Sequence, residues 1–134
     1  MAVNHESIDT NLLLRLILND IPAQRIAVKK LLSRENVTFI VEDLAISEII
    51  YVLETKLGYD RAAVVETVRL IMNLPNISCN KTLFNLVLPL YLERPKLSFN
   101  DCCLAGYAQL SGAKPLWTFD HKMAMQLDAA KELK

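Results

Sequence analysis

Apolar residues along this chain fall into short runs with two different spacings. Residues 37–41 are β-branched and aromatic, which is typical of a buried strand. Elsewhere apolar residues recur every three or four positions, which predicts helices. Further strands are expected at residues 3–8, 76–79 and 116–119. Helices are expected over residues 10–18, from Pro22, over 44–56 and 61–73, from about Lys81, over 100–110, and from His121 to about Leu133.

Short strands that alternate with helices predict an α/β fold. Such strands are joined by right-handed crossovers, so they form a parallel sheet with helices on both faces. Ligands of these sheets bind beyond the carboxyl ends of the strands, near the helix N-termini. The sequence contains no internal repeat and no linker, and we expect a single domain over residues 1–134.

Several polar residues and prolines mark where the helices begin and end. Asp9 or Thr10 suits the N-cap of the first helix, and Ser98 with Asp101 three residues later predicts a capping box. Pro89 indicates either a kink in the helix that starts near Lys81 or its end.

Four acidic residues stand out because their neighbours in the sequence are apolar and none has a basic residue beside it. Asp9 and Asp120 follow predicted strands, Asp101 begins a helix, and Glu48 lies in the first turns of a helix that follows a strand. Burying an unpaired carboxylate costs several kcal/mol, which is comparable with the net stability of a domain. We expect the four side chains to converge at one edge of the sheet, around a divalent cation.

Each acid also has a purely structural interpretation. Asp9, Asp101 and Asp120 could be N-caps that contribute about 1 kcal/mol each, which is the commoner use of Asp at a helix start. Glu48 is not at a helix start and cannot be an N-cap, but it could form a structural ion pair with Arg15. One metal site explains all four positions together, so it is favoured for the set.

The sequence around these acids resembles a known family. The segments Ile8-Asp9-Thr10-Asn11, Ser47-Glu48, Phe99-Asn100-Asp101 and Thr118-Phe119-Asp120 are similar to the ordered acidic signature of PIN-domain ribonucleases. The resemblance is closest to the VapC-type toxins of prokaryotic toxin–antitoxin pairs. Residues 19–24 and 51–54 are also similar to connecting segments of that group, so the resemblance covers nearly the whole chain.

The resemblance implies a three-layer α/β/α sandwich with a short central parallel sheet. It implies that Asp9, Glu48, Asp101 and Asp120 bind one or two Mg²⁺ or Mn²⁺ ions, with Asn11 and Thr118 at supporting polar positions. It further implies endonucleolytic cleavage of RNA, neutralisation by a cognate antitoxin protein, and a homodimer. The first strand departs from the family pattern, because His5 and Glu6 replace a continuous apolar run.

Carboxylates suit this chemistry. Mg²⁺ prefers oxygen ligands and retains several waters, and it can activate a water for attack on a phosphodiester. The expected products carry a 3′-hydroxyl and a 5′-phosphate. No histidine base is needed, and His5 and His121 are the two histidines in the sequence.

Two rival functions use the same acids differently. A Mg²⁺-dependent phosphatase of the haloacid dehalogenase kind also begins with an Asp after a first strand. That group needs a second Asp two residues later, where this chain has Asn11. A catalytically silent PIN-like binding module would be favoured by the loss of an acid, but all four acids are present.

Composition limits the remaining possibilities. Fifteen basic and fifteen acidic residues cancel, so any attraction to phosphate must be local or carried by a metal. Three cysteines without a CxxC spacing favour neither a disulfide framework nor a zinc site. The N-terminus resembles no secretion signal, and residues 82–92, the longest uncharged run, are too few to span a bilayer. We therefore expect a cytoplasmic protein with no membrane partner.

Overall fold

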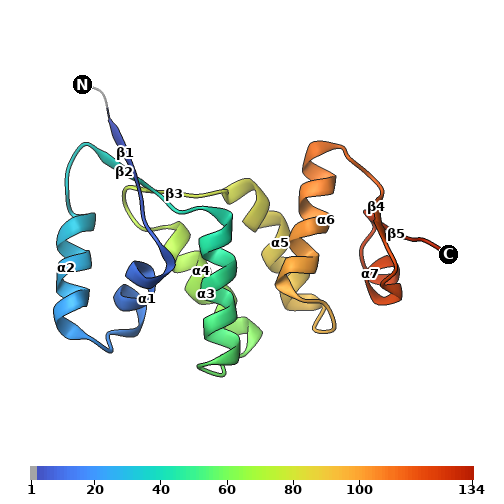
Figure 1. Ribbon diagram of the computed structural model, residues 1–134, viewed down its shortest axis with the longest axis horizontal. Helices are drawn as coiled ribbons and strands as arrows, with labels where there is room; N and C mark the ends of the chain where they lie inside the picture. The colour runs from blue at the N-terminus through green and yellow to red at the C-terminus, as the bar shows by residue number, and fades with distance from the viewer. Residues whose placement is uncertain (1–2) are drawn as a thin grey trace. The chain divides into compact units, whose positions relative to one another are not determined.

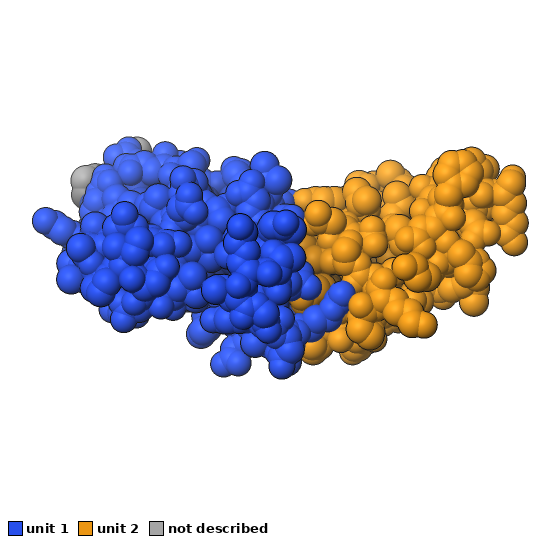
Figure 2. All heavy atoms as spheres, turned by 60° about the horizontal axis from the view of Figure 1, so that its bottom comes forward, with its two compact units in different colours: residues 1–80 blue, residues 81–134 orange. Residues whose placement is uncertain are grey.

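A computed structural model describes residues 3–134 of the chain. The segment that is expected to contain no secretion signal begins with Met1 and Ala2, which lie outside the described residues. The chain divides into two compact units, Met1–Asn80 and Lys81–Lys134, which are coloured separately in Figure 2. The expected single domain over the whole chain stays a prediction.

The first unit contains a short parallel sheet. Its strands are β1 (Asn4–Ser7), β2 (Val37–Ile40) and β3 (Ile77–Ser78), in the order β1-β2-β3. Asn4 pairs with Val37 and Phe39 pairs with Ile77, both in parallel register. This sheet confirms the prediction of an α/β fold with short parallel strands.

Four helices connect and flank these strands (Figure 1). They are α1 (Thr10–Leu18), α2 (Pro22–Leu32), α3 (Asp43–Thr55) and α4 (Arg61–Met72). Their apolar positions form the core with the strands, because residues three or four apart share one helix face. Side chains at most 1% exposed include Leu13, Phe39, Ile46, Ile49, Leu53, Val64 and Val68.

The predicted bounds of α1, α3 and α4 agree with the structure to within one residue. Asp60 caps α4 by accepting a hydrogen bond from the Ala63 N–H at 2.8 Å, and Pro22 occupies the first turn of α2. Asn19 ends α1 in the left-handed region at φ 49°, and Gly58 adopts φ 66° after α3. Asn and Gly tolerate this backbone conformation best.

The second unit contains three helices and a separate two-stranded sheet. The helices are α5 (Lys81–Glu93), α6 (Phe99–Ser111) and α7 (His121–Gln126). The strands β4 (Leu116–Thr118) and β5 (Ala130–Glu132) pair in parallel. Pro89 lies inside α5, which continues past it to Glu93.

The packing of α5 against α6 forms the core of this unit. The Phe99 ring stacks on Phe84 with centroids 6.2 Å apart and meets Tyr91 edge-on at 5.7 Å. Gly106 allows the two helices to approach closely, because a Cβ there would lie 2.6 Å from the Cγ2 atom of Val87.

The prediction of a final helix to about Leu133 is wrong. Helix α7 ends at Gln126, and residues 130–132 form β5. Ala130, Lys131 and Glu132 favour helices intrinsically, but their pairing with β4 overrides that weak preference. The buried side chains of Leu127 and Ala129 hold the connecting segment against the unit.

The helices of residues 3–134 are all too short or too polar to cross a membrane.

Candidate active site at the strand ends

Asp9 lies at the carboxyl end of β1, where α1 begins. The Ile8 N–H extends the sheet by donating to the Ile40 carbonyl at 3.1 Å, and the Ile8 side chain is buried. Asp9 follows as the N-cap of α1, and its carboxylate accepts a hydrogen bond from the Leu12 N–H at 3.1 Å. The strand and the helix start therefore fix the position of this acid.

Glu48 lies in the second turn of α3, on its exposed side. Ile46, Ile49 and Ile50 take the inward positions and are buried, whereas Glu48 is exposed. The expectation that an apolar sequence buries Glu48 is therefore wrong, because neighbours in a helix point in different directions. The other three acids are exposed (Asp9) or half-buried (Asp101 and Asp120).

The alternative ion pair between Glu48 and Arg15 is also wrong. Arg15 pairs with Asp20 at 2.8 Å. Glu48 instead accepts a hydrogen bond from the hydroxyl of Thr10, with 2.7 Å between Oγ1 and Oε2.

Asp9 and Glu48 line the same pocket. This pocket encloses about 300 Å³. It is lined by Asp9, Thr10, Asn11, Leu14, Glu48, Tyr51 and Val52. The structure thus brings together two of the four predicted acids and Asn11, one of the two supporting residues.

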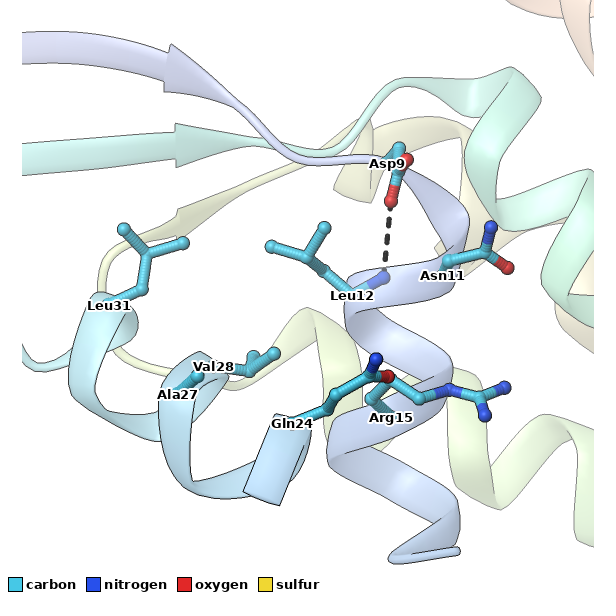
Figure 3. A pocket seen from close by; sticks show the side chains of 8 residues that line it. All are labelled: Asp9, Asn11, Leu12, Arg15, Gln24, Ala27, Val28 and Leu31. Carbon is cyan, nitrogen blue, oxygen red and sulfur yellow. Dashed lines mark hydrogen bonds between the residues drawn. The ribbon is translucent and has the colours of Figure 1, made fainter. Parts of the chain in front are cut away.

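A second pocket of about 640 Å³ lies on the other side of Asp9, between α1 and α2 (Figure 3). Figure 3 shows Leu12 of α1 pointing toward α2, which carries Val28 and Leu31, while the Asn11 side chain points away from α2. Asp9 and Asn11 line both pockets. The candidate site therefore borders a largely apolar hollow.

In the second unit, Asp101 is half-buried in the first turn of α6. It forms the predicted capping box with Ser98: its N–H donates to Ser98 Oγ at 3.0 Å, and its Oδ2 accepts from the Ser98 N–H at 3.3 Å. The capping-box prediction is confirmed, and the carboxylate of Asp101 is engaged with the start of its own helix.

Asp120 caps α7 in the same unit. Its Oδ1 accepts from the N–H groups of Lys122 at 2.9 Å and Met123 at 3.3 Å. Thr118, the second supporting residue, accepts a hydrogen bond from the Asp120 N–H at 2.9 Å through its hydroxyl. Thr118 therefore contacts the backbone of Asp120 rather than its carboxylate.

The Asp9 and Glu48 pair fits a hard divalent cation. Within residues 3–134, His, Cys, Asp and Glu side chains form no preassembled group of three or more around one point. Mg²⁺ is commonly held by one or two carboxylates together with waters and substrate phosphates. Two carboxylates beside an open pocket meet that requirement. The thiols of Cys79, Cys102 and Cys103 are free.

A comparison with protein families assigns the chain to one of them. The PIN domain family matches residues 7–126. The chain belongs to the PIN domain family. PIN domains are generally metal-dependent nucleases, which are hydrolases, and PIN nucleases act on RNA in general. A search of curated proteins finds no match to this PIN domain.

Thr10 is a polar residue of this PIN domain that the hydropathy pattern does not single out. Its hydroxyl contacts one of the predicted acids, and its backbone follows another. In the sequence, Thr10 is marked by its position next to Asp9, and that position is equally typical of a helix cap.

Proposed function

We propose that this PIN domain is a Mg²⁺- or Mn²⁺-dependent endoribonuclease. Its metal ligands are Asp9, Glu48, Asp101 and Asp120, and Asn11 and Thr118 support them. The observation that carries this proposal is the pocket shared by Asp9 and Glu48 at the carboxyl end of β1. Two carboxylates at such an edge are suited to a cation that binds a phosphate.

The structure of the chain holds and orients the proposed metal ligands. The cap bond of Asp9 engages Oδ1, so the other carboxylate oxygen remains able to bind a cation. A divalent ion held by these carboxylates would supply an activated water and positive charge to offset the charge on the leaving oxygen. The products are a 3′-hydroxyl and a 5′-phosphate, and no histidine base takes part.

Net charge supports a role for the metal in binding RNA. The chain carries no net charge at pH 7, and its candidate ligands are anionic. Carboxylates alone would repel a polyanion, whereas a divalent ion between them attracts one.

We also propose that the protein is the toxin of a VapC-type toxin–antitoxin pair. The acidic segments support this assignment through their resemblance to that group. A cytoplasmic homodimer neutralised by a cognate antitoxin follows from the same resemblance.

The test of the nuclease is cleavage of labelled total RNA by the purified full chain. We expect cleavage with Mg²⁺ or Mn²⁺, 5′-phosphate ends on the products, and no cleavage in EDTA. Asp9→Asn and Asp101→Asn should both abolish it. Asparagine also caps helices, so these variants are expected to keep their folds.

Asp60→Asn is the matched control. Asp60 caps α4 with the same geometry as Asp9, but it lies outside the candidate site. This variant loses the same charge and should cleave RNA as the wild type does. Folded wild-type protein that cleaves no RNA with either metal would contradict the nuclease and favour the catalytically silent binding module.

A further inference from the structure

The contact between Thr10 and Glu48 joins two helices at the candidate site. Thr10 is the first residue of α1, and Glu48 lies 38 residues later in α3. The 2.7 Å between Oγ1 and Oε2 is the distance of a charge-assisted hydrogen bond from a hydroxyl to a carboxylate. Such bonds are stronger than those between neutral groups.

The sheet anchors both partners of this bond. Ile8, two residues before Thr10, is hydrogen-bonded to Ile40 of β2. Helix α3 starts at Asp43, shortly after Ile40, and Asn80 donates to the Asp43 carboxylate at 3.2 Å. The starts of α1 and α3 therefore follow adjacent parallel strands, which sets the separation of Thr10 from Glu48.

The two side chains differ in stiffness. Threonine is branched at Cβ, and in a helix it is restricted to two rotamers about its first side-chain bond. An exposed glutamate rotates about three bonds and loses considerable conformational entropy when it is fixed. A stiff donor on an anchored backbone therefore restricts the orientation of a flexible carboxylate before any ligand binds.

We propose that Thr10 is a positioning residue that orients the Glu48 carboxylate for a divalent cation bound beside Asp9. The hydrogen bond engages Oε2, and a carboxylate has about four lone-pair sites, so Glu48 retains capacity to bind a cation. Asp9 and Thr10 are consecutive, so one short segment provides a ligand and orients another. This inference rests on the proposed metal site.

The test is the affinity of the full chain for Mn²⁺, measured by electron paramagnetic resonance of the free ion. Thr10→Val removes the hydroxyl and keeps the side-chain shape. We expect Mn²⁺ affinity to fall about 10- to 100-fold, as for other residues that orient metal ligands. Thr10→Ser keeps the hydroxyl and should restore affinity close to that of the wild type. Thr10→Ala, which lacks both γ-methyl groups of valine, repeats the test if Thr10→Val fails to fold.

Thr67→Val is the matched control. The Thr67 hydroxyl donates to the Ala63 carbonyl at 2.8 Å within α4, outside the pocket of Asp9 and Glu48. This variant loses a hydroxyl and a hydrogen bond of comparable length, yet Mn²⁺ affinity should stay unchanged. Thermal unfolding of each variant in EDTA separates a loss of stability from a loss of metal affinity.

The outcomes distinguish this inference from the proposed function. If the wild type binds Mn²⁺ and the Thr10→Val and Thr10→Ala variants bind it equally well, the hydrogen bond merely ties α1 to α3 and the positioning role is wrong. If the wild type binds no Mn²⁺, the metal site itself is wrong, and the role of Thr10 with it.

Discussion

The acidic residues of the two units make different contacts. In the first unit, Asp9 at the start of α1 and Glu48 within α3 line one pocket. In the second, the carboxylates of Asp101 and Asp120 accept hydrogen bonds from backbone N–H groups at the start of their own helices. Both arrangements leave each acid exposed or half-buried.

This difference shows that capping and metal binding do not exclude each other. Asp9 is the N-cap of its helix as Asp120 is, and it still shares a pocket with Glu48. A cap hydrogen bond engages part of a carboxylate and orients the rest. Glu48, which caps nothing, is therefore the acid whose structural role is easiest to separate from a role in binding metal.

The largest expected effect tests whether the two units unfold together. Leu13 in α1 and Leu83 in α5 are both 0% exposed, so Leu13→Ala and Leu83→Ala each leave a cavity in one unit. We expect each variant to lower the free energy of unfolding by about 2–5 kcal/mol. If the chain is a single cooperative domain, urea unfolding followed by circular dichroism shows one transition that both variants shift.

Leu57→Ala is the control for these core substitutions, because Leu57 is 43% exposed and lies after α3. It should shift the transition much less. Two transitions, each moved by the variant of its own unit alone, would contradict the single domain and make the units independent.

The core of the fold follows from the sequence because its pattern is local. Spacing of three or four residues places Ile46, Ile49 and Leu53 on one face of α3, and all three are buried. Capping residues likewise act within a few positions, as Ser98 and Asp101 do. Such features depend on residues that are close together in the sequence, so they can be predicted from it.

Features that depend on distant contacts are not predicted. Strand β5 forms because its backbone pairs with β4, and the helical preference of Ala130 and Lys131 gives no sign of that pairing. The hydrogen bond between Thr10 and Glu48 depends on the packing of α1 against α3. The family signature locates the acids, but their exposure follows from the helix faces that they occupy.

A smaller effect shows which acids hold the metal. A ligand present at 100 times its dissociation constant raises the free energy of unfolding by about 2.7 kcal/mol. We expect Mn²⁺ at that concentration to stabilise the wild type by this amount, as measured by thermal unfolding. Glu48→Gln, Asp9→Asn, Asp101→Asn and Asp120→Asn should each reduce that gain, whereas Asp60→Asn should keep it.

The pattern among these variants shows whether both units provide metal ligands. Loss of the gain in all four supports one set of four ligands. Loss in Asp9→Asn and Glu48→Gln alone would confine the metal to the pocket of the first unit, and would leave Asp101 and Asp120 as caps. An undiminished gain in Glu48→Gln would contradict its role as a ligand.

The smallest expected effect separates capping from catalysis at Asp120. Its Oδ1 accepts two backbone hydrogen bonds, so Asp120→Ala should lower the free energy of unfolding by about 1 kcal/mol. Asp120→Asn keeps an acceptor at the same place and should unfold at nearly the wild-type temperature. If Asp120 also binds metal, both variants lose RNA cleavage, because neither carries the negative charge. If Asp120→Asn still cleaves RNA, and Asp120→Ala loses cleavage only in proportion to its loss of stability, then Asp120 acts as a cap alone. In that case Asp120 would stabilise the start of α7 and would not bind metal.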